Sequence, residues 1–337
     1  MNRTFYPILF LCLLLACSLR AQDVHFSQYY FSPLSLNPAN TGNFKGDYRL
    51  FANYRSQWRA LDKGYNTYSA GGDMNFYPNN LNISPGLIFI SDKSAQSLSV
   101  TKILPSFACH LKLGGYKLHA GIQPGVVIKT IDFYSHSFPN QLNWETGQFD
   151  HNLPNIETNV SQRYTYFDLN AGFAASRKFG KFEPEIGFAV FHVNKPRESF
   201  LTDKSNKLPV RQAYNAAIHY DLTNNVVLHL HTLYGYTTKA SDWVSGLNVE
   251  YVLSRDAFFR NSVFAGFMWR DGFNRNFDAS ILTAGLNWKN YTMGFSYDIT
   301  NSALKTSVDS KGAYEIAIIY RAKSTRLSRK AVNCERF

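Results

Sequence analysis

The feature that most constrains this chain is a two-residue alternation of apolar and polar side chains, which starts at Tyr48 and continues to Tyr320. Successive side chains of a β-strand point to opposite faces, so this period gives each strand one apolar face. In 291–298 that face begins and ends in tyrosine: Tyr291, Met293, Phe295 and Tyr297. The pattern is typical of lipid-facing strands, because hydrocarbon contacts the middle and amphipathic rings lie at the two membrane interfaces.

The same alternation recurs in 182–190, 214–220, 243–251 and 314–320. Counting such segments gives roughly fourteen, an even number of about ten residues each, as in bacterial outer-membrane barrels. A soluble sandwich also alternates, but its outward face has no reason to carry rings at both ends of the apolar stripe. We therefore predict an all-β fold, a transmembrane antiparallel β-barrel of about 14 strands over 48–320.

Connection lengths provide an independent check on this prediction. If the first strand rises from the periplasm, the periplasmic turns are short and fall at 78–82, 114–115, 180–181, 223–225, 254–256 and 289–290. The long connections then all lie on the external side, at 132–163, 194–208, 271–277 and 300–312. Outer-membrane barrels combine short periplasmic turns with long external loops.

Composition excludes several other classes of protein. After the first twenty or so residues, no apolar run approaches the ~20 residues of a membrane-spanning helix, which excludes a helical membrane protein. A hydrophobic content of 45% excludes a disordered chain. The length of 337 residues, which would suggest two domains in a soluble protein, instead fits one closed sheet of many strands.

The N-terminus has the layout of a secretory signal peptide over 1–21. Arg3 precedes an apolar stretch, and small residues lead to Ala21, after which we expect cleavage. A lipoprotein signal that presents Cys17 for acylation is the alternative. Loss of Arg3 and Arg20 lowers the formal charge from +11 to +9. The mature chain keeps only two cysteines, too few for a disulfide scaffold.

Two segments lie outside the strands. Residues 22–47 show no good strand or helix pattern but are rich in aromatic residues, which favour burial. We therefore expect this segment to be a plug in the lumen or to cover the periplasmic mouth. Residues 321–337 form a basic periplasmic tail, either solvated or a docking strand. Cys109 shares parity with Phe107 and should point at lipid, which makes a disulfide to Cys334 geometrically unfavourable.

No constellation of residues points to catalysis. His229 and His231 share a strand face and could bind a metal, but no acid or cysteine at ligand spacing completes a shell, so lumen-lining side chains are the favoured interpretation. The chain has no G-x-S-x-G elbow, Walker loop or dinucleotide fingerprint. We expect no catalytic residue, no metal and no cofactor. Export makes a nucleic-acid partner improbable.

Several short motifs are spread over essentially the whole mature chain. They are the segments 22–29 with 32–33, 36–39 and Gly42; 53–58; 138–141; 192–196 with 199–200; 294–298 with Ser302 and Leu304; 314–316; and 332–337. Together and in this order they resemble the PorP/SprF family, outer-membrane proteins of the type IX secretion system in Bacteroidota. In the last segment, Glu335 replaces the family's proline.

The resemblance implies a barrel of about fourteen strands without enzymatic activity. It would act in gliding motility and in the export or surface anchoring of a secreted adhesin-type substrate with a C-terminal sorting domain. A periplasmic peptidoglycan-binding lipoprotein and outer-membrane lipid are the other expected partners.

With this resemblance, we hypothesise that the external loops 132–163 and 194–208 form a cradle for the partner. The expected partner-binding residues are Phe138, Gln141, Trp144, His192, Asn194, Pro196 and Phe200. The N-terminal segment would contribute Phe26, Gln28, Tyr29, Asn37 and Pro38, and the tail Arg326, Arg329, Lys330, Cys334 and Arg336. A passive outer-membrane porin is the main alternative. A barrel enzyme and a secreted sandwich are more distant ones.

Overall fold

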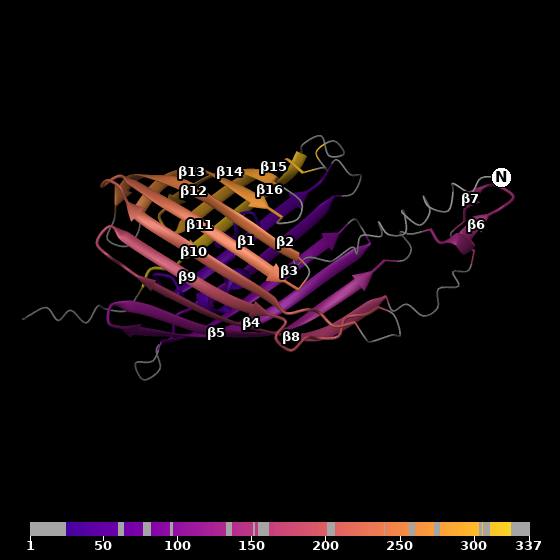
Figure 1. Ribbon diagram of the computed structural model, residues 1–337, viewed down its shortest axis with the longest axis horizontal. Coiled ribbons are helices and arrows are strands. Elements are labelled where there is room, and N and C mark those ends of the chain that lie inside the picture. Colours follow the sequence, from indigo (N-terminus) through magenta and orange to yellow (C-terminus); the bar gives the residue numbers. More distant parts are fainter. Residues whose placement is uncertain are drawn as a thin grey trace, which may run out of the picture.

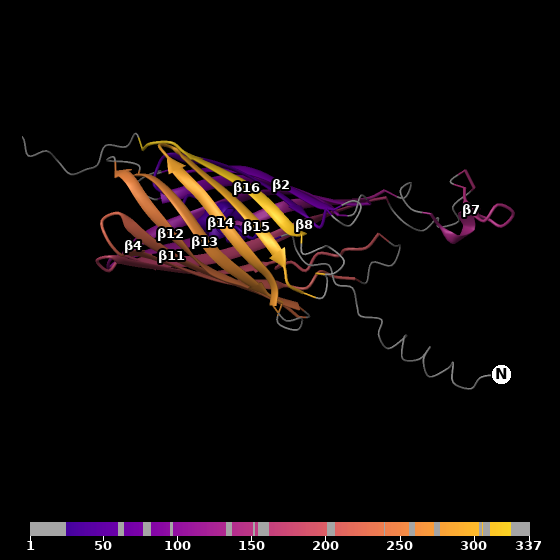
Figure 2. The same cartoon turned by 90° about the horizontal axis from the view of Figure 1, so that it is seen from above.

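The computed structural model contains a closed barrel of fourteen antiparallel strands, as predicted (Figures 1 and 2). It describes residues 25–59, 64–76, 82–94, 97–132, 137–150, 152–153, 162–200, 206–238, 240–255, 260–272, 277–302, 305 and 311–324. The barrel strands are β1 (Tyr48–Gln57), β2 (Tyr65–Met74), β3 (Asn82–Ser94), β4 (Leu98–Leu113), β5 (Tyr116–Ile131), β8 (Arg163–Arg177), β9 (Phe182–Phe191), β10 (Arg211–Asp221), β11 (Val226–Thr237), β12 (Ala240–Arg255), β13 (Arg260–Asp271), β14 (Phe277–Trp288), β15 (Tyr291–Thr300) and β16 (Lys311–Arg321).

Each strand pairs with its neighbour in the chain, and β1 pairs with β16 to close the sheet. The order is interrupted only between β5 and β8, which pair with each other across a small separate hairpin, β6 (Leu142–Asn143) and β7 (Gln148–Phe149). Figure 1 shows this hairpin standing away from the barrel. This hairpin lies within 132–163, which is expected from the sequence to be a loop. Several strands are also longer than expected and reach 16 residues.

The outer surface of the barrel is apolar in the middle and aromatic at both ends. On β15 the exposed side chains are Tyr291, Met293, Phe295 and Tyr297, and the intervening residues 294, 296 and 298 are buried. Tyr48, Tyr320 and Tyr291 lie together at one end, with ring centroids 5.9 and 5.1 Å apart. Tyr54 contacts Tyr68 and Tyr314 at the other, at 4.9 and 5.8 Å. No helix among the described residues is long and apolar enough to cross a membrane.

The two ends of the barrel differ in their connections. Tyr48 and Arg321 lie at the end with tight turns such as Gly114–Gly115, where φ is +55° and +85° and glycine is favoured. The connections 132–162, 192–210 and 301–310 join strands at the opposite end. Outer-membrane barrels place short turns in the periplasm, so we assign the glycine-turn end to the periplasm and the opposite end to the exterior.

A charge placed on the lipid face of β15 tests the position of this surface in the bilayer. Phe295→Arg puts a guanidinium near the middle of the apolar band and should destabilise the folded barrel by about 2–4 kcal/mol, whereas Tyr291→Arg at the interface should cost about 0–1 kcal/mol. Denaturant unfolding in phospholipid vesicles measures both. Equal losses for the two variants would contradict the assigned lipid face.

Candidate functional site

The lumen is filled by the segment that precedes β1, which we name the plug (residues 25–47). It contains three single-turn helices, η1 (Tyr29–Phe31), α2 (Pro33–Leu36) and η2 (Pro38–Asn40), where the sequence analysis expects no regular element. Proline favours the first position of a helix because its fixed φ suits the helix. Its missing N–H costs nothing there, since the N–H of a first helical residue has no partner within the helix. The Asn37 side chain caps η2 by accepting from the backbone N–H of Ala39 at 2.9 Å.

Plug side chains form the apolar interior of the barrel. Phe31 and Leu34 pack with Phe51, Ile88 and Leu104, which come from strands on one side of the lumen. Tyr29 packs in a second cluster, formed with Ala189, Phe191, Ala213, Leu233, Val244, Met268 and Ile281. Burial raises the pKa of the Tyr29 phenol above its usual range, so this side chain stays uncharged. The plug therefore packs against wall residues on two sides of the lumen.

Two wall glycines show how closely the plug approaches the strands. A Cβ atom at Gly121 would lie 2.4 Å from the backbone of Pro38, and one at Gly172 would lie 1.9 Å from Oδ1 of Asn37. Asn37 also donates from Nδ2 to the carbonyl oxygen of Phe173 at 3.0 Å. Any larger residue at these two wall positions would displace the plug.

Near the external end, a buried network of charges joins the plug to four strands, β1, β13, β15 and β16. The backbone N–H groups of Ser27 and Gln28 donate to the two carboxylate oxygens of Glu315, at 2.6 and 2.8 Å. The Ser27 hydroxyl donates to Asp298 at 2.7 Å and accepts from Arg55 at 2.8 Å. Arg55 also forms ion pairs with both carboxylates. We name these residues, with Arg270, the Ser27 network.

Arg270 completes the charge balance of the Ser27 network. Its guanidinium lies 3.1 Å from Asp298 and donates to the Ser27 hydroxyl at 3.1 Å. Arg270 also pairs with the partly exposed Asp278 at 2.9 Å. In the buried part of the network, two guanidinium groups therefore face two carboxylates that are nearly inaccessible to solvent. Burial of an unpaired charge is costly, and the balance of the set allows four ions to remain inside the barrel.

A second anchor holds the periplasmic end of the plug. Arg49 forms a bidentate pair with Asp73, at 2.9 and 2.6 Å, and donates to the carbonyl oxygen of Asn40 at 3.0 Å. Asp73 in turn accepts from the backbone N–H of Gly42 at 2.6 Å. Since Ser27 lies near the external ends of β1 and β16 and Gly42 near the periplasmic end of β2, the plug runs through the lumen from the external half to the periplasmic mouth.

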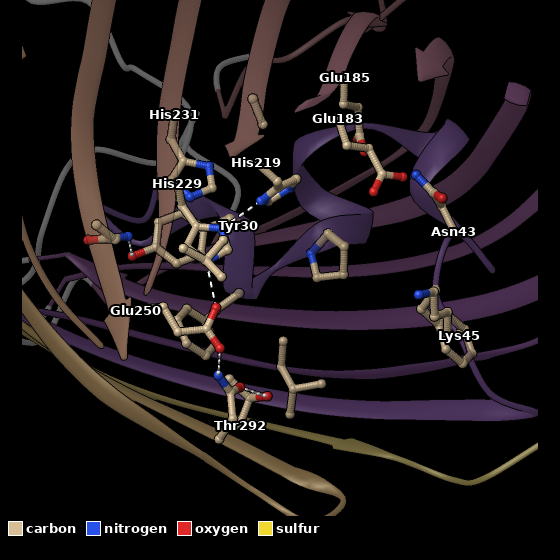
Figure 3. Close-up of a pocket in the computed structure, with 18 of the residues that line it drawn as sticks. Tyr30, Asn43, Lys45, Glu183, Glu185, His219, His229, His231, Glu250 and Thr292 are labelled. Atoms are coloured by element: carbon tan, nitrogen blue, oxygen red, sulfur yellow. Dashed lines mark hydrogen bonds and ion pairs between the residues drawn. The ribbon is translucent and has the colours of Figure 1, made fainter. Parts of the chain in front are cut away.

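Beneath the plug lies a periplasmic vestibule of about 710 Å³ (Figure 3). His219 and His229 point toward each other, with their Nδ1 atoms 2.5 Å apart, and Nε2 of His229 lies 2.6 Å from Glu250. His231 stacks on Tyr30 at 4.6 Å. His229 and His231 thus face the lumen, as the strand parity predicts. Among the described residues, no group of three or more His, Cys, Asp and Glu side chains is arranged to hold a metal ion.

The predicted partner-binding residues fall in two separate places on the external side. Phe138 precedes η5 (Pro139–Gln141), and the buried Gln141 side chain accepts from the Phe138 backbone N–H at 3.2 Å. Trp144, in the turn of the β6–β7 hairpin, is 86% exposed. These three residues belong to the part that stands away from the barrel in Figure 1.

The remaining predicted residues follow the external end of β9. His192 is buried in a left-handed backbone conformation, with φ of +58°, and its Nδ1 lies 2.8 Å from Asp168. Asn194 is exposed, Pro196 is buried and Phe200 is half-buried. Of the predicted plug residues, Phe26, Gln28, Tyr29, Asn37 and Pro38 are all buried. The tail residues Arg326, Arg329, Lys330, Cys334 and Arg336, like residues 1–24, lie outside the described part of the chain.

Sequence reasoning gave no role to the charged residues that anchor the plug. Arg55, Asp298 and Glu315 lie within the motifs at 53–58, 294–298 and 314–316, and all three fall on the lumen parity of their strands. Their position, a charge at a lumen-facing site inside a family motif, is the signal that could have identified them.

Comparison with known proteins now identifies the family. Residues 18–320 match the family model of the type IX secretion system membrane protein PorP/SprF. The chain belongs to the PorP/SprF family. This membership and the barrel fold place it in the bacterial outer membrane as a component of type IX secretion. No curated protein matches the chain.

Solved structures of other barrels share the fold. The TodX deltaS2S3 mutant monoaromatic hydrocarbon channel aligns with a TM-score of 0.51 at 9% identity, over 85% of this chain and 93% of that one. The CymD monoaromatic hydrocarbon channel aligns with a TM-score of 0.49 at 9% identity, over 88% and 94%. A Pseudomonas aeruginosa FadL homologue aligns with a TM-score of 0.48 at 9% identity, over 84% and 92%. Likeness at this level of identity concerns the fold alone.

Removal of one cation from the Ser27 network should release the plug while leaving the barrel intact. Arg55→Met leaves two buried carboxylates with one guanidinium and should weaken plug docking by about 3–5 kcal/mol. Hydrogen exchange of the plug amides measures the loss, and heat-dependent gel mobility reports barrel folding.

A second variant serves as the matched control. Arg55→Met combined with Glu315→Gln restores the charge balance and should recover part of the protection. Unchanged exchange in Arg55→Met alone would show that the network does not hold the plug.

Proposed function

We propose that this protein is a plugged outer-membrane anchor, a non-enzymatic accessory protein of type IX secretion. In this proposal it is needed for the export or surface anchoring of one secreted adhesin-type substrate, which carries a C-terminal sorting domain, and it serves gliding motility. The observation that carries the proposal is the plug, which occupies the lumen and is held by buried ion pairs at both ends. A filled lumen favours a scaffold over a passage for solutes.

The partner would dock on the external side of the barrel. Support comes from the β6–β7 hairpin, which projects away from the wall, and from its exposed Trp144. A large aromatic ring exposed on a projecting hairpin makes no contribution to a core, and tryptophan is among the residues that dominate binding energy at protein interfaces. On the periplasmic side, the basic residues from Arg321 onward are the proposed contact for a periplasmic peptidoglycan-binding lipoprotein.

Single-channel recording separates the anchor from the passive porin. The wild-type barrel in a planar bilayer should give no steady conductance, because the plug fills the lumen. Deletion of residues 22–42 removes the part of the plug that contains its three helices and should produce discrete conductance steps. The porin alternative predicts the same steady conductance from both proteins, and that result would overturn the anchor proposal.

Two exposed tryptophans at opposite ends of the molecule allow a matched test of the docking side. Trp144→Ala should reduce surface retention of the secreted partner about tenfold, equivalent to about 1.4 kcal/mol. Trp288→Ala, at the periplasmic end of β14, should leave retention unchanged. Quantitative surface labelling of the partner in cells gives both values. Retention that falls only in Trp288→Ala, or in neither variant, would contradict external docking at the hairpin.

A further inference from the structure

One barrel strand extends far beyond its neighbour at the external end. β8 has 15 residues, but β9 pairs only with the part from Ala171 to Ser176. On its other side β8 pairs with β5 as far as the Thr130–Arg163 pair. Residues 163–170 of β8 therefore have a strand partner on one side only among the described residues.

The lower part of this free edge is capped by the turn that follows β9. The backbone N–H of Val193 donates to the carbonyl oxygen of Leu169 at 2.9 Å. The Asn194 side chain accepts from the Leu169 N–H at 3.1 Å and donates to the Phe167 carbonyl oxygen at 2.8 Å. The Val193 N–H and the Asn194 side-chain amide thus replace the pairing that a longer β9 would supply.

Above the Asn194 cap the edge is open. The contacts of Leu169 show that odd-numbered residues of β8 direct their backbone N–H and carbonyl groups toward this edge, because these groups alternate between the two sides of a strand. In the described part of the chain, the Phe167 N–H and both backbone groups of Thr165 meet no partner there. Unpaired strand edges of this kind can bind a further strand.

The open edge lies at the external boundary of the membrane. An apolar band about 25 Å tall is crossed by roughly ten residues of a tilted strand, so from Arg177 at the periplasmic end the band ends near residues 167–168. Unpaired backbone groups are not tolerated in hydrocarbon, which agrees with an Asn194 cap at the lipid boundary and an open edge beyond it.

The wall that carries this edge is supported from inside. Leu208 packs on Val100, Val127 and Tyr166 at the inner face of β4, β5 and β8. Glu198, from the same 192–210 connection, forms an ion pair with Lys129 of β5. The external part of β8 is therefore held in place from the lumen side, and its free edge presents a fixed row of hydrogen-bonding groups.

The surroundings of the edge are basic. Three basic side chains are exposed beside the Asn194 cap: Lys195, Arg197 and Lys207. The backbones of Arg197 and Lys207 lie next to each other in an isolated antiparallel β-bridge. Two acids of this region are engaged in ion pairs, Glu198 with Lys129 and Asp168 with His192. Charge complementarity thus favours an acidic segment as the ligand of this edge.

We propose that the external edge of β8, at residues 165–167, binds an extended acidic segment of the secreted partner by β-strand addition. The segment takes the place beside β8 that β9 leaves open, pairs with Thr165 and Phe167, and is attracted by Lys195, Arg197 and Lys207. The identity of the ligand as the secreted partner rests on the proposed function, whereas strand addition at this edge does not.

Thr165→Pro tests the backbone contact, because it removes an N–H that faces the open edge and leaves the β5 ladder intact. The probe is a synthetic eight-residue peptide of alternating glutamate and valine, added to the full-length barrel in nanodiscs. Wild type should bind it and protect the Thr165 and Phe167 amides from hydrogen exchange. Thr165→Pro should bind at least about tenfold more weakly, whereas Thr165→Ser, which keeps the N–H, should bind like wild type.

A second variant, which changes charge, tests the site even if the proline variant misfolds locally. Lys195→Glu with Arg197→Glu leaves the β8 backbone unchanged and should also weaken binding at least about tenfold, an effect reduced at high salt. Absence of peptide protection in wild type, or equal binding by all variants, overturns strand addition. If the variants lose peptide binding but retain the secreted partner on cells, the edge site stands and its assignment to the proposed function is wrong.

Discussion

Every part of this structure depends on one constraint, that backbone polar groups inside a bilayer must be paired within the protein. Fourteen strands satisfy it by closing β1 onto β16, and alternation then directs apolar side chains to lipid and the others to the lumen. A closed wall of this size encloses space that must be filled or wetted. The plug fills it with groups such as Phe31 and Leu34, so the barrel has an apolar interior as well as an apolar exterior.

A plug that fills the lumen must be held at one position along the barrel axis, and the buried charges determine that position. Apolar packing alone would tolerate small shifts of the plug along the barrel axis. The Ser27 network permits one position, because two backbone N–H groups and a hydroxyl must meet Glu315 and Asp298 while Arg55 and Arg270 neutralise them. The Arg49–Asp73 pair repeats this arrangement at the other end. Buried ions here define register more than they add stability.

The limits of prediction from sequence follow from the range of each interaction. The face of β15 that carries apolar side chains is set by residues two apart, and the lengths of the turns are equally local. The barrel, with its short connections at one end and long ones at the other, could therefore be predicted. The contact between Ser27 and Glu315 joins residues 288 positions apart, and no local pattern encodes it. The helical turns of the plug were missed for a related reason, since Pro33 and Pro38 break longer patterns and each helix is stabilised by the wall around it.

The role of residues 192–196 became clear only from the structure. From the sequence, this segment is only a match to the family, in which His192, Asn194 and Pro196 are expected to bind the partner. In the fold, the left-handed conformation of His192 turns the chain after β9, and the Asn194 amide then pairs with the edge of β8 where the bilayer would not tolerate an open backbone group. β9 can therefore end early without exposing unpaired groups to lipid. The same device separates the sealed wall of the barrel from an edge that remains available to another chain on the external side.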